Sequence, residues 1–243
     1  MEKEWFATWF DTTYYHVLYK NRNDEEAKVF IANLTKHLAL PTHAEVLDLA
    51  CGKGRHSITL NELGYTVHGV DLSANSISEA SKHEKKGLSF GVHDMRLPIP
   101  NRSFAAVFNL FTSFGYFNDT SDNLKVLQSV WQMLDAKGLL IIDFMNATRV
   151  VNTLVTEESK TIDGIDFSIQ RNYDGTHIFK DIRFEDNGRN YHFTERVQAL
   201  RFENFQSLLK ESRFKILRTF GDFNLSPFEA ETSDRLIIIA QKN

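Results

Sequence analysis

A short apolar strand that runs into a glycine turn and then into a helix constrains this chain more than any other stretch. The stretch is Val46-Leu-Asp-Leu-Ala-Cys-Gly-Lys-Gly-Arg-His56, and residues 57–63 carry apolar side chains at helical spacing. Gly52 and Gly54 put no Cβ between the main chain and a ligand, and they tolerate a positive φ. Unpaired N–H groups at the start of the helix suit a carboxylate or phosphate. The stretch therefore predicts a nucleotide-type cradle.

A second predicted strand, Thr66-Val-His-Gly-Val-Asp71, follows the cradle and ends in an acid. An acid at the carboxyl end of the second strand suits the two hydroxyls of a ribose. The dehydrogenase fingerprint Gly-x-Gly-x-x-Gly would align with residues 52–57, and it would place Ser57 where the third glycine lets helix and strand pack closely. This incomplete match disfavours a nicotinamide cofactor, which stays the alternative.

The pattern Asp48-x-Ala50-x-Gly52-x-Gly54 resembles motif I of the class I S-adenosylmethionine-dependent methyltransferases. Asp71 stands where the second motif of that family has its ribose-binding acid, and Leu72 follows it. His93-Asp94-Met95 resembles the third motif, in which an acid lies near the adenine amino group and an apolar residue lies against the ring. The resemblance covers roughly the first 145 residues and the end of the chain. It implies S-adenosylmethionine as cofactor and a cofactor site made of Asp48, Ala50, Gly52, Gly54, Asp71, Leu72, Asp94 and Met95.

The order of predicted elements gives the expected fold class. At 243 residues the chain is long enough for one large α/β domain, and we expect residues 1–243 to form a single domain. Helical and strand patterns alternate up to residue 144, and two further strands follow at 214–220 and 235–241. The resemblance implies a seven-stranded, mostly parallel, doubly wound sheet with an antiparallel last strand.

The first 40 residues are predicted to be helical and are rich in aromatic side chains. In the family, a segment before the first strand often closes over the cofactor, and residues 14–22 look similar to such a lid. The resemblance implies that Tyr19 covers the sulfonium and that Arg22 binds the methionine carboxylate, since a guanidinium presents a planar fork of donors. The alternatives are that the aromatic residues pack the helices on the sheet and that Arg22 is a solvated surface charge.

Residues 109–116 follow the carboxyl end of the fourth predicted strand, so they should line the ligand crevice. We expect Asn109 to contact the surroundings of the transferred methyl, and Tyr14 and Tyr116 to face the acceptor. The segment has no proline, which argues against the Asn/Asp-Pro-Pro-aromatic motif of methyltransferases that act on DNA bases. No spacing singles out a catalytic base among the candidates, which are His16, His192, Glu195, Asp143, Tyr14 and Tyr116.

Residues 160–202 change to a period of two and contain the turns Asp174-Gly175 and Asn187-Gly188. Two hairpin turns between alternating runs predict a three-stranded antiparallel β insertion. It resembles the insertion with which small-molecule methyltransferases, including glycine and amino-sugar N-methyltransferases, wall the substrate pocket. A structural cover or a homodimer contact is the alternative, because a half-apolar sheet must be buried somewhere.

Composition and charge disfavour several partners. The net charge of −4 gives no global reason to bind nucleic acid. A basic stripe on the insertion is interleaved with acids; it comprises Arg171, Lys180, Arg183, Arg189, Arg196 and Arg201. Metal is not expected, because Asp143 and Asn146 are separated by two residues instead of adjacent. The lone cysteine, Cys51, excludes an internal disulfide, and with no signal peptide or long apolar run we expect a cytoplasmic protein without membrane contact.

The combined patterns predict a methyltransferase that moves the methyl group of S-adenosylmethionine by in-line displacement to an amine or hydroxyl of a small molecule. Such a reaction depends mainly on aligning the nucleophile behind the methyl and on excluding water. One alternative is a methyltransferase that acts on a protein or an RNA. Another is a regulatory module that binds S-adenosylmethionine without catalysis.

Overall fold

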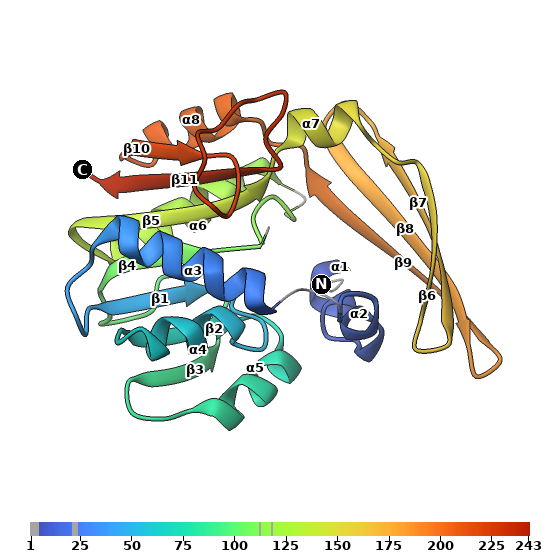
Figure 1. The fold of residues 1–243 in the computed structure, drawn as a ribbon, viewed down its shortest axis with the longest axis horizontal. Helices are drawn as coiled ribbons and strands as arrows, with labels where there is room; N and C mark the ends of the chain where they lie inside the picture. Colours follow the sequence, from blue (N-terminus) through green and yellow to red (C-terminus); the bar gives the residue numbers. More distant parts are fainter. Residues whose placement is uncertain (1–4, 21–23, 112, 118) are drawn as a thin grey trace.

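A computed structural model describes residues 5–20, 24–111, 113–117 and 119–243. Its larger sheet, sheet A, has seven strands in the order β10-β11-β5-β4-β1-β2-β3 (Figure 1). The strands are β1 (Glu45–Leu49), β2 (Thr66–Asp71), β3 (Leu88–Val92), β4 (Phe104–Asn109), β5 (Leu134–Met145), β10 (Phe214–Phe220) and β11 (Arg235–Lys242). β11 runs antiparallel to the other six strands, which are parallel to one another, and this confirms the predicted seven-stranded, mostly parallel sheet. The strand order reverses at β1, so a ligand crevice is expected at its carboxyl end.

Helices cover both faces of sheet A. They are α3 (Asp24–Leu38), α4 (Arg55–Glu62), α5 (Ala74–Ala80), α6 (Thr120–Met133) and α8 (Phe202–Glu211), with a 3₁₀ turn at Ser81–His83. Neighbouring residues of β1 serve the two layers, since successive side chains of a strand point to opposite faces. Val46 packs with the α3 and α4 side, and Leu47 packs with the α6 and α8 side. Every residue of β1 after Glu45 is buried, as a strand in a sheet covered on both faces requires.

A second sheet, sheet B, has four antiparallel strands in the order β6-β7-β8-β9. They are β6 (Glu157–Ile162), β7 (Ile165–Tyr173), β8 (His177–Asp186) and β9 (Arg189–Gln198). The predicted three strands correspond to β7, β8 and β9, so the prediction of a three-stranded insertion was wrong by one strand. It missed β6 because this edge strand carries charged side chains and buries only Ile162, so it shows no alternation.

The helices of the predicted N-terminal segment pack on different sheets. Short helices α1 (Trp5–Trp9) and α2 (Thr13–Leu18) lie between the body of the molecule and sheet B (Figure 1), where Trp9 and Leu18 pack with the apolar face of β7 and β8. Helix α3 instead packs on sheet A through Phe30 and Leu34. Helix α7 (Ala147–Asn152) leads from β5 into sheet B. Among the described residues no helix is long and apolar enough to cross a membrane.

Candidate functional site

The glycine turn after β1 adopts the backbone conformation that its sequence favours. Gly52 and Gly54 have φ values of 56° and 82°, and Ala50 between strand and turn has a φ of 63°. A Cβ on Gly52 would have no atom within 4 Å, whereas a Cβ on Gly54 would lie 2.7 Å from the ring of Phe90. Gly52 therefore leaves room on the ligand side, and Gly54 is required for packing.

Asp71 closes the turn from the neighbouring strand. Its Oδ2 accepts a hydrogen bond from the Gly52 N–H at 2.8 Å, and its Oδ1 accepts one from the Ser73 N–H at 2.8 Å. Burial raises the pKa of Asp71, while these N–H groups act in the opposite direction. Each carboxylate oxygen has a further lone pair, so the two oxygens can still accept the two hydroxyls of a ribose.

Asp48 lies beneath the turn and not in the cavity. Its side chain is 1% exposed, and the Ser57 hydroxyl donates to its Oδ2 at 2.6 Å. Burial raises the pKa of Asp48 to about 6 against the effect of this hydrogen bond. Ser57, which replaces the third glycine of a dehydrogenase, thus ties α4 to β1.

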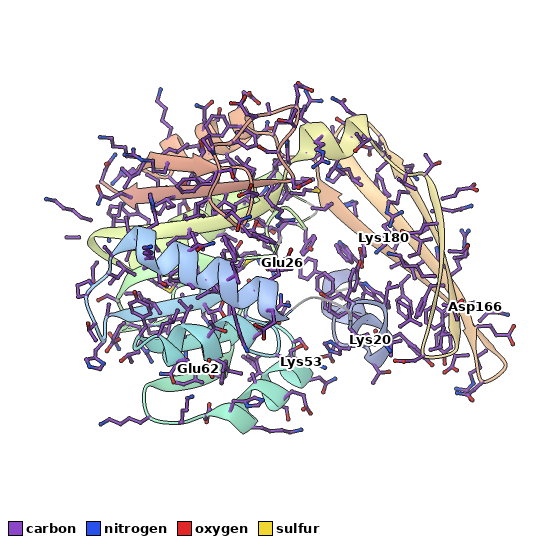
Figure 2. The ribbon with its side chains drawn as sticks, in the orientation of Figure 1. Lys20, Glu26, Lys53, Glu62, Asp166 and Lys180 are labelled. Atoms are coloured by element: carbon purple, nitrogen blue, oxygen red, sulfur yellow. The ribbon has the colours of Figure 1, made fainter. Side chains whose placement is uncertain are left out.

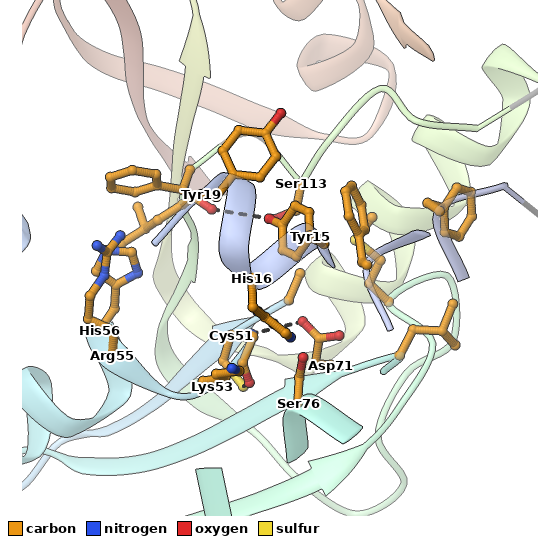
Figure 3. Close-up of a pocket in the computed structure, with 18 of the residues that line it drawn as sticks. Tyr15, His16, Tyr19, Cys51, Lys53, Arg55, His56, Asp71, Ser76 and Ser113 are labelled. Carbon is orange, nitrogen blue, oxygen red and sulfur yellow. Dashed lines mark hydrogen bonds between the residues drawn. The ribbon is translucent and has the colours of Figure 1, made fainter. Parts of the chain in front are cut away.

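A cavity of about 760 Å³ opens between the carboxyl ends of β1, β2 and β4 and the α1–α2 segment (Figure 3). It brings together many of the residues that the sequence proposes; those that line it are Tyr19, Ala50, Gly52, Asp71, Leu72, Asp94, Met95 and Tyr116. Gly54 and Asp48 support the turn from behind. Arg22 lies outside the described residues.

Two predicted residues lie elsewhere. Tyr14 does not line the cavity, because its hydroxyl donates to Asp186 Oδ2 at 2.8 Å and its ring packs on Phe184 in sheet B. Its neighbour Tyr15 lines the cavity instead. Asn109 is also behind the wall, where its Nδ2 donates to the Leu49 carbonyl at 2.9 Å and joins β4 to β1. The geometry therefore does not support Asn109 as a direct ligand of the cofactor or Tyr14 as a residue that faces the acceptor.

Aromatic rings form the wall of the cavity opposite the glycine turn. The ring of Phe10 lies 4.8 Å from that of Tyr15 and 5.3 Å from that of Tyr116, centroid to centroid. Tyr15 is also 4.9 Å from Tyr19. The sequence marked this segment as aromatic but did not identify Phe10 and Tyr15 as wall residues, because the orientation of such short helices and of the turn between them depends on packing.

Tyr19 is anchored to sheet B by a partly buried polar cluster. Its hydroxyl contacts both oxygens of Glu195, at 2.8 and 2.9 Å, and accepts from the Lys180 ammonium. The Trp9 indole N–H donates to the same carboxylate at 2.7 Å. Burial and the Glu195 charge raise the pKa of Tyr19 well above its usual value, so the phenol stays protonated. Glu195 therefore fixes both α1 and α2 against sheet B.

Asp94 lines the far end of the cavity and forms an ion pair with Arg96, with 2.6 Å between Oδ2 and the guanidinium. Burial acts to raise the pKa of Asp94, but the hydrogen bonds from Arg96 outweigh it and lower the pKa. Arg96 also contacts Asp122 at 3.0 Å. Asp94 is therefore an ionised acceptor that can receive an adenine amino group.

Structural contacts engage both residues considered for a metal or acid–base role, the acid Asp143 and the amide Asn146. Asp143 is fully buried and accepts from Arg235 Nε at 2.8 Å. Asn146 donates to the Ala230 and Ser233 carbonyls. Within the described part of the chain, no group of three or more His, Cys, Asp or Glu side chains could bind a metal ion.

The residues fit S-adenosylmethionine on structural grounds. Gly52 leaves open space for a ligand, and Asp71 presents a carboxylate at the strand end for the ribose. The side chains of Leu72 and Met95 supply apolar contact near Asp94 for a base. Tyr19 and Tyr15 supply ring faces, which attract a cation such as a sulfonium.

Three comparisons with known proteins agree with this geometry. Residues 41–181, more than half of the chain, match the model of a methyltransferase domain family. The putative methyltransferase YqeM of Bacillus subtilis is 29% identical over 215 residues, which cover 84% of this chain and 87% of YqeM. A glycine/sarcosine N-methyltransferase of Aphanothece halophytica is 27% identical over 236 residues, 91% of this chain and 83% of that protein.

The fold is also similar to solved structures. The crystal structure of an S-adenosylmethionine-dependent methyltransferase from Clostridium acetobutylicum superposes with a TM-score of 0.79. The two chains are 20% identical, and the match covers 95% of this chain and 96% of the other. At this identity the likeness is one of fold.

Proposed function

Because this chain belongs to the methyltransferase domain family and uses S-adenosylmethionine as its methyl donor, we propose that it methylates an amine nitrogen of a small molecule. A small-molecule hydroxyl is the second acceptor class. The relative from Aphanothece halophytica is named for amine acceptors, glycine and sarcosine. That name supports an amine acceptor here without identifying it.

The aromatic wall opposite the glycine turn carries the proposal. Phe10, Tyr15 and Tyr116 face the side on which the cofactor's sulfonium would lie. Rings at this place stabilise positive charge through their faces, and they exclude water from the acceptor. Desolvation lowers the pKa of an ammonium group, which yields the neutral amine that attacks.

The chain's own residues then act mainly by orientation. When bound, S-adenosylmethionine would supply the methyl group for in-line displacement by the amine, with S-adenosylhomocysteine as the leaving group. Asp71 and the glycine turn set the position of the donor, while Tyr15 and Tyr116 confine the amine behind the methyl. Such positioning contributes about 7–11 kcal/mol in favourable cases. The proton that the amine releases after attack can leave through His16, which lines the cavity.

The first measurement is isothermal titration with S-adenosylmethionine and, separately, with NAD(H). We expect micromolar binding of the former alone. A methyl-transfer assay should then compare glycine, sarcosine and an amino sugar with a catechol that offers only hydroxyls. Turnover of an amine supports the proposal. Turnover of the catechol alone would contradict an amine acceptor, and binding without any turnover in a broad screen would favour a regulatory module.

The charges of sheet B weigh against an RNA acceptor. Arg171 pairs with Glu158 at 2.6 Å, and Lys180 lies 3.8 Å from Glu195 on the side that faces α2. Figure 2 shows Lys180 between sheet B and the α1–α2 segment. These two residues of the predicted basic stripe are therefore occupied by acids of the same sheet.

A further inference from the structure

We propose that Gln198, the last residue of β9, is a positioning residue that fixes the ring of Tyr116 in the aromatic wall of the cavity. The inference rests on the proposed function only for its cofactor, and it does not depend on which acceptor is methylated. Three observations lead to it: the hydrogen bonds of Gln198 on both sides of Tyr116, the burial of Gln198, and a buried amide of α6 that orients it.

Gln198 binds the peptide groups on both sides of Tyr116. Its backbone N–H donates to the Gly115 carbonyl at 2.8 Å, and its side-chain Nε2 donates to the Phe117 carbonyl at 3.2 Å. The indole N–H of Trp5 donates to the carbonyl between them, that of Tyr116, at 3.3 Å. Three consecutive carbonyls are therefore bound from outside the segment, two of them by one residue at the end of β9, which lies close to this segment (Figure 1).

The amide of Gln198 is buried and held in one orientation. The residue is 3% exposed, and its Oε1 accepts from the Asn123 Nδ2 at 2.6 Å. Its Nε2 is therefore the atom that faces the Phe117 carbonyl, since the reverse orientation would place two oxygens against each other. Such an amide can hold a neighbouring backbone in place, because loss of its donor takes this bond from a buried carbonyl.

Asn123 of α6 orients Gln198 at a cost to its own side chain. It is fully buried, and within the described part of the chain its Oδ1 has no hydrogen-bond partner. A buried oxygen without a partner is destabilising, so core packing alone would favour an apolar residue here. The bond from Nδ2 to Gln198 is the contact that accounts for an asparagine at this position.

The segment that Gln198 fixes carries part of the aromatic wall. Tyr116 and Phe117 both line the cavity. The ring of Tyr116 lies 5.3 Å from that of Phe10 and 5.3 Å from that of Trp5, so the N-terminal segment supports the ring while Gln198 holds its backbone. An aromatic face attracts a cation only within about 6 Å of its centroid, so a small shift of this backbone weakens the contact with a sulfonium.

The test uses two forms of the cofactor that differ in charge at sulfur. S-adenosylmethionine is a sulfonium cation, and S-adenosylhomocysteine is the neutral thioether with the same adenine, ribose and amino-acid parts. Isothermal titration should give Gln198→Met an affinity for S-adenosylmethionine that is about three- to tenfold lower, the size of a contact between a cation and a ring. Its affinity for S-adenosylhomocysteine should stay within about twofold, which also shows that the variant is folded.

The matched control is Gln170→Met, because Gln170 is a glutamine on the exposed face of β7 in the same sheet. It should bind both ligands as the wild type does. Asn123→Leu is a second variant, which keeps Gln198 and removes the buried oxygen that has no partner. It should show a smaller loss for S-adenosylmethionine alone, because Gln198 then lacks the donor that orients it.

A third variant, Tyr116→Ala, connects the effect to the ring. It should lose affinity for S-adenosylmethionine and keep its affinity for S-adenosylhomocysteine. The double variant with Gln198→Met should lose no more than Tyr116→Ala alone, because Gln198 acts through Tyr116.

Equal losses for both ligands in Gln198→Met, or no loss for either, would overturn the positioning role. Fully additive losses in the double variant, or an unchanged preference between the two ligands in Tyr116→Ala, would overturn it as well. If the wild type bound neither ligand, both this inference and the proposed function would fail. If Gln198→Met lost affinity for S-adenosylmethionine alone but the wild type methylated no amine, only the proposed function would fail.

Discussion

Asp48 is a buried carboxyl group whose titration affects stability. Its pKa is raised by burial to about 6, whereas an aspartate in an unfolded chain titrates near ~3.9. The folded state therefore binds this proton more tightly. The stability that this tighter proton binding contributes is fully present below about pH 4 and is lost as the pH rises through about 6. A shift of about two pKa units corresponds to about 3 kcal/mol.

We expect Asp48→Asn to remove this pH dependence, because an asparagine has no charge to bury and can still accept from Ser57. We compare the free energy of unfolding of the variant with that of the wild type at each pH. The variant should gain about 1–3 kcal/mol over the wild type when the pH is raised from about 4 to about 7. Urea denaturation at the two pH values measures it. The same difference between variant and wild type at both pH values would show that the folded state does not raise the pKa of Asp48.

Asp71 has a separate role, because its carboxylate faces the cavity. Asp71→Ala removes the proposed acceptor for the ribose hydroxyls and the contact with the Gly52 N–H. We expect S-adenosylmethionine to bind about 10–100-fold more weakly in isothermal titration. Asp135→Ala, an acid at the opposite edge of the sheet that accepts from Ser103, is the control. Unchanged affinity in Asp71→Ala would refute the ribose assignment.

Substituting each glycine of the turn by alanine, which adds one methyl group, can distinguish the roles of the two glycines. Gly54→Ala places a Cβ 2.7 Å from the Phe90 ring, which is also packed over Gly69, so the ring has little room to move. We expect a loss of about 2 kcal/mol or more of stability. Gly52→Ala meets no protein atom within 4 Å, so it should be milder for folding and should weaken cofactor binding. Thermal unfolding and titration of both variants check this, and a reversed pattern would contradict it.

At the scale of elements, contacts with sheet B determine the positions of α1 and α2. Glu195 of β9 accepts from Trp9 and from Tyr19, and Lys180 of β8 lies beside it. Helices this short have little stability of their own, so tertiary contacts determine their position. The inserted sheet therefore holds in place the helices that carry part of the aromatic wall of the cavity.

We expect Glu195→Ala to loosen the two helices, because it leaves the Trp9 and Tyr19 donors without their acceptor and the Lys180 ammonium without its counter-charge. The local cost should be about 2 kcal/mol or more. Hydrogen exchange should become faster in α1 and α2 while sheet A keeps its protection. Glu185→Ala, on the exposed face of β8, is the matched control. Unchanged exchange in α1 and α2 would show that Glu195 does not anchor them.

At the scale of the whole molecule, the cavity joins segments that are distant in the chain. Its wall combines α2, the glycine turn, the end of β2 and the residues after β4. A ligand that binds there stabilises the folded chain by mass action, by about 2.7 kcal/mol when it is present at 100 times its Kd.

We therefore expect S-adenosylmethionine at that concentration to raise the unfolding midpoint by about 5–10 °C for a chain of this size. Differential scanning fluorimetry measures the shift, and NAD(H) at equal concentration is the control. A shift that NAD(H) also produces would indicate a different cofactor class.

The sequence alone determined the succession of most strands along the chain, the glycine turn and the acids that follow successive strands. These features depend on local periodicity and on turn chemistry, and the carboxyl ends of parallel strands meet at one edge. Asp71 and Asp94 could therefore be placed in advance. The edge strand β6 could not, because it has almost no apolar alternation.

The tertiary structure decided which side chains of the correct segments reach the cavity. Tyr15 lines it and Tyr14 does not, because Asp186 and Phe184 set the rotation of α2 from a distant hairpin. Likewise, the contacts of Phe111 with Arg55 and Asp143 join residues that are far apart in the chain. Such contacts depend on how packed elements meet in space, and no local pattern of residues encodes that.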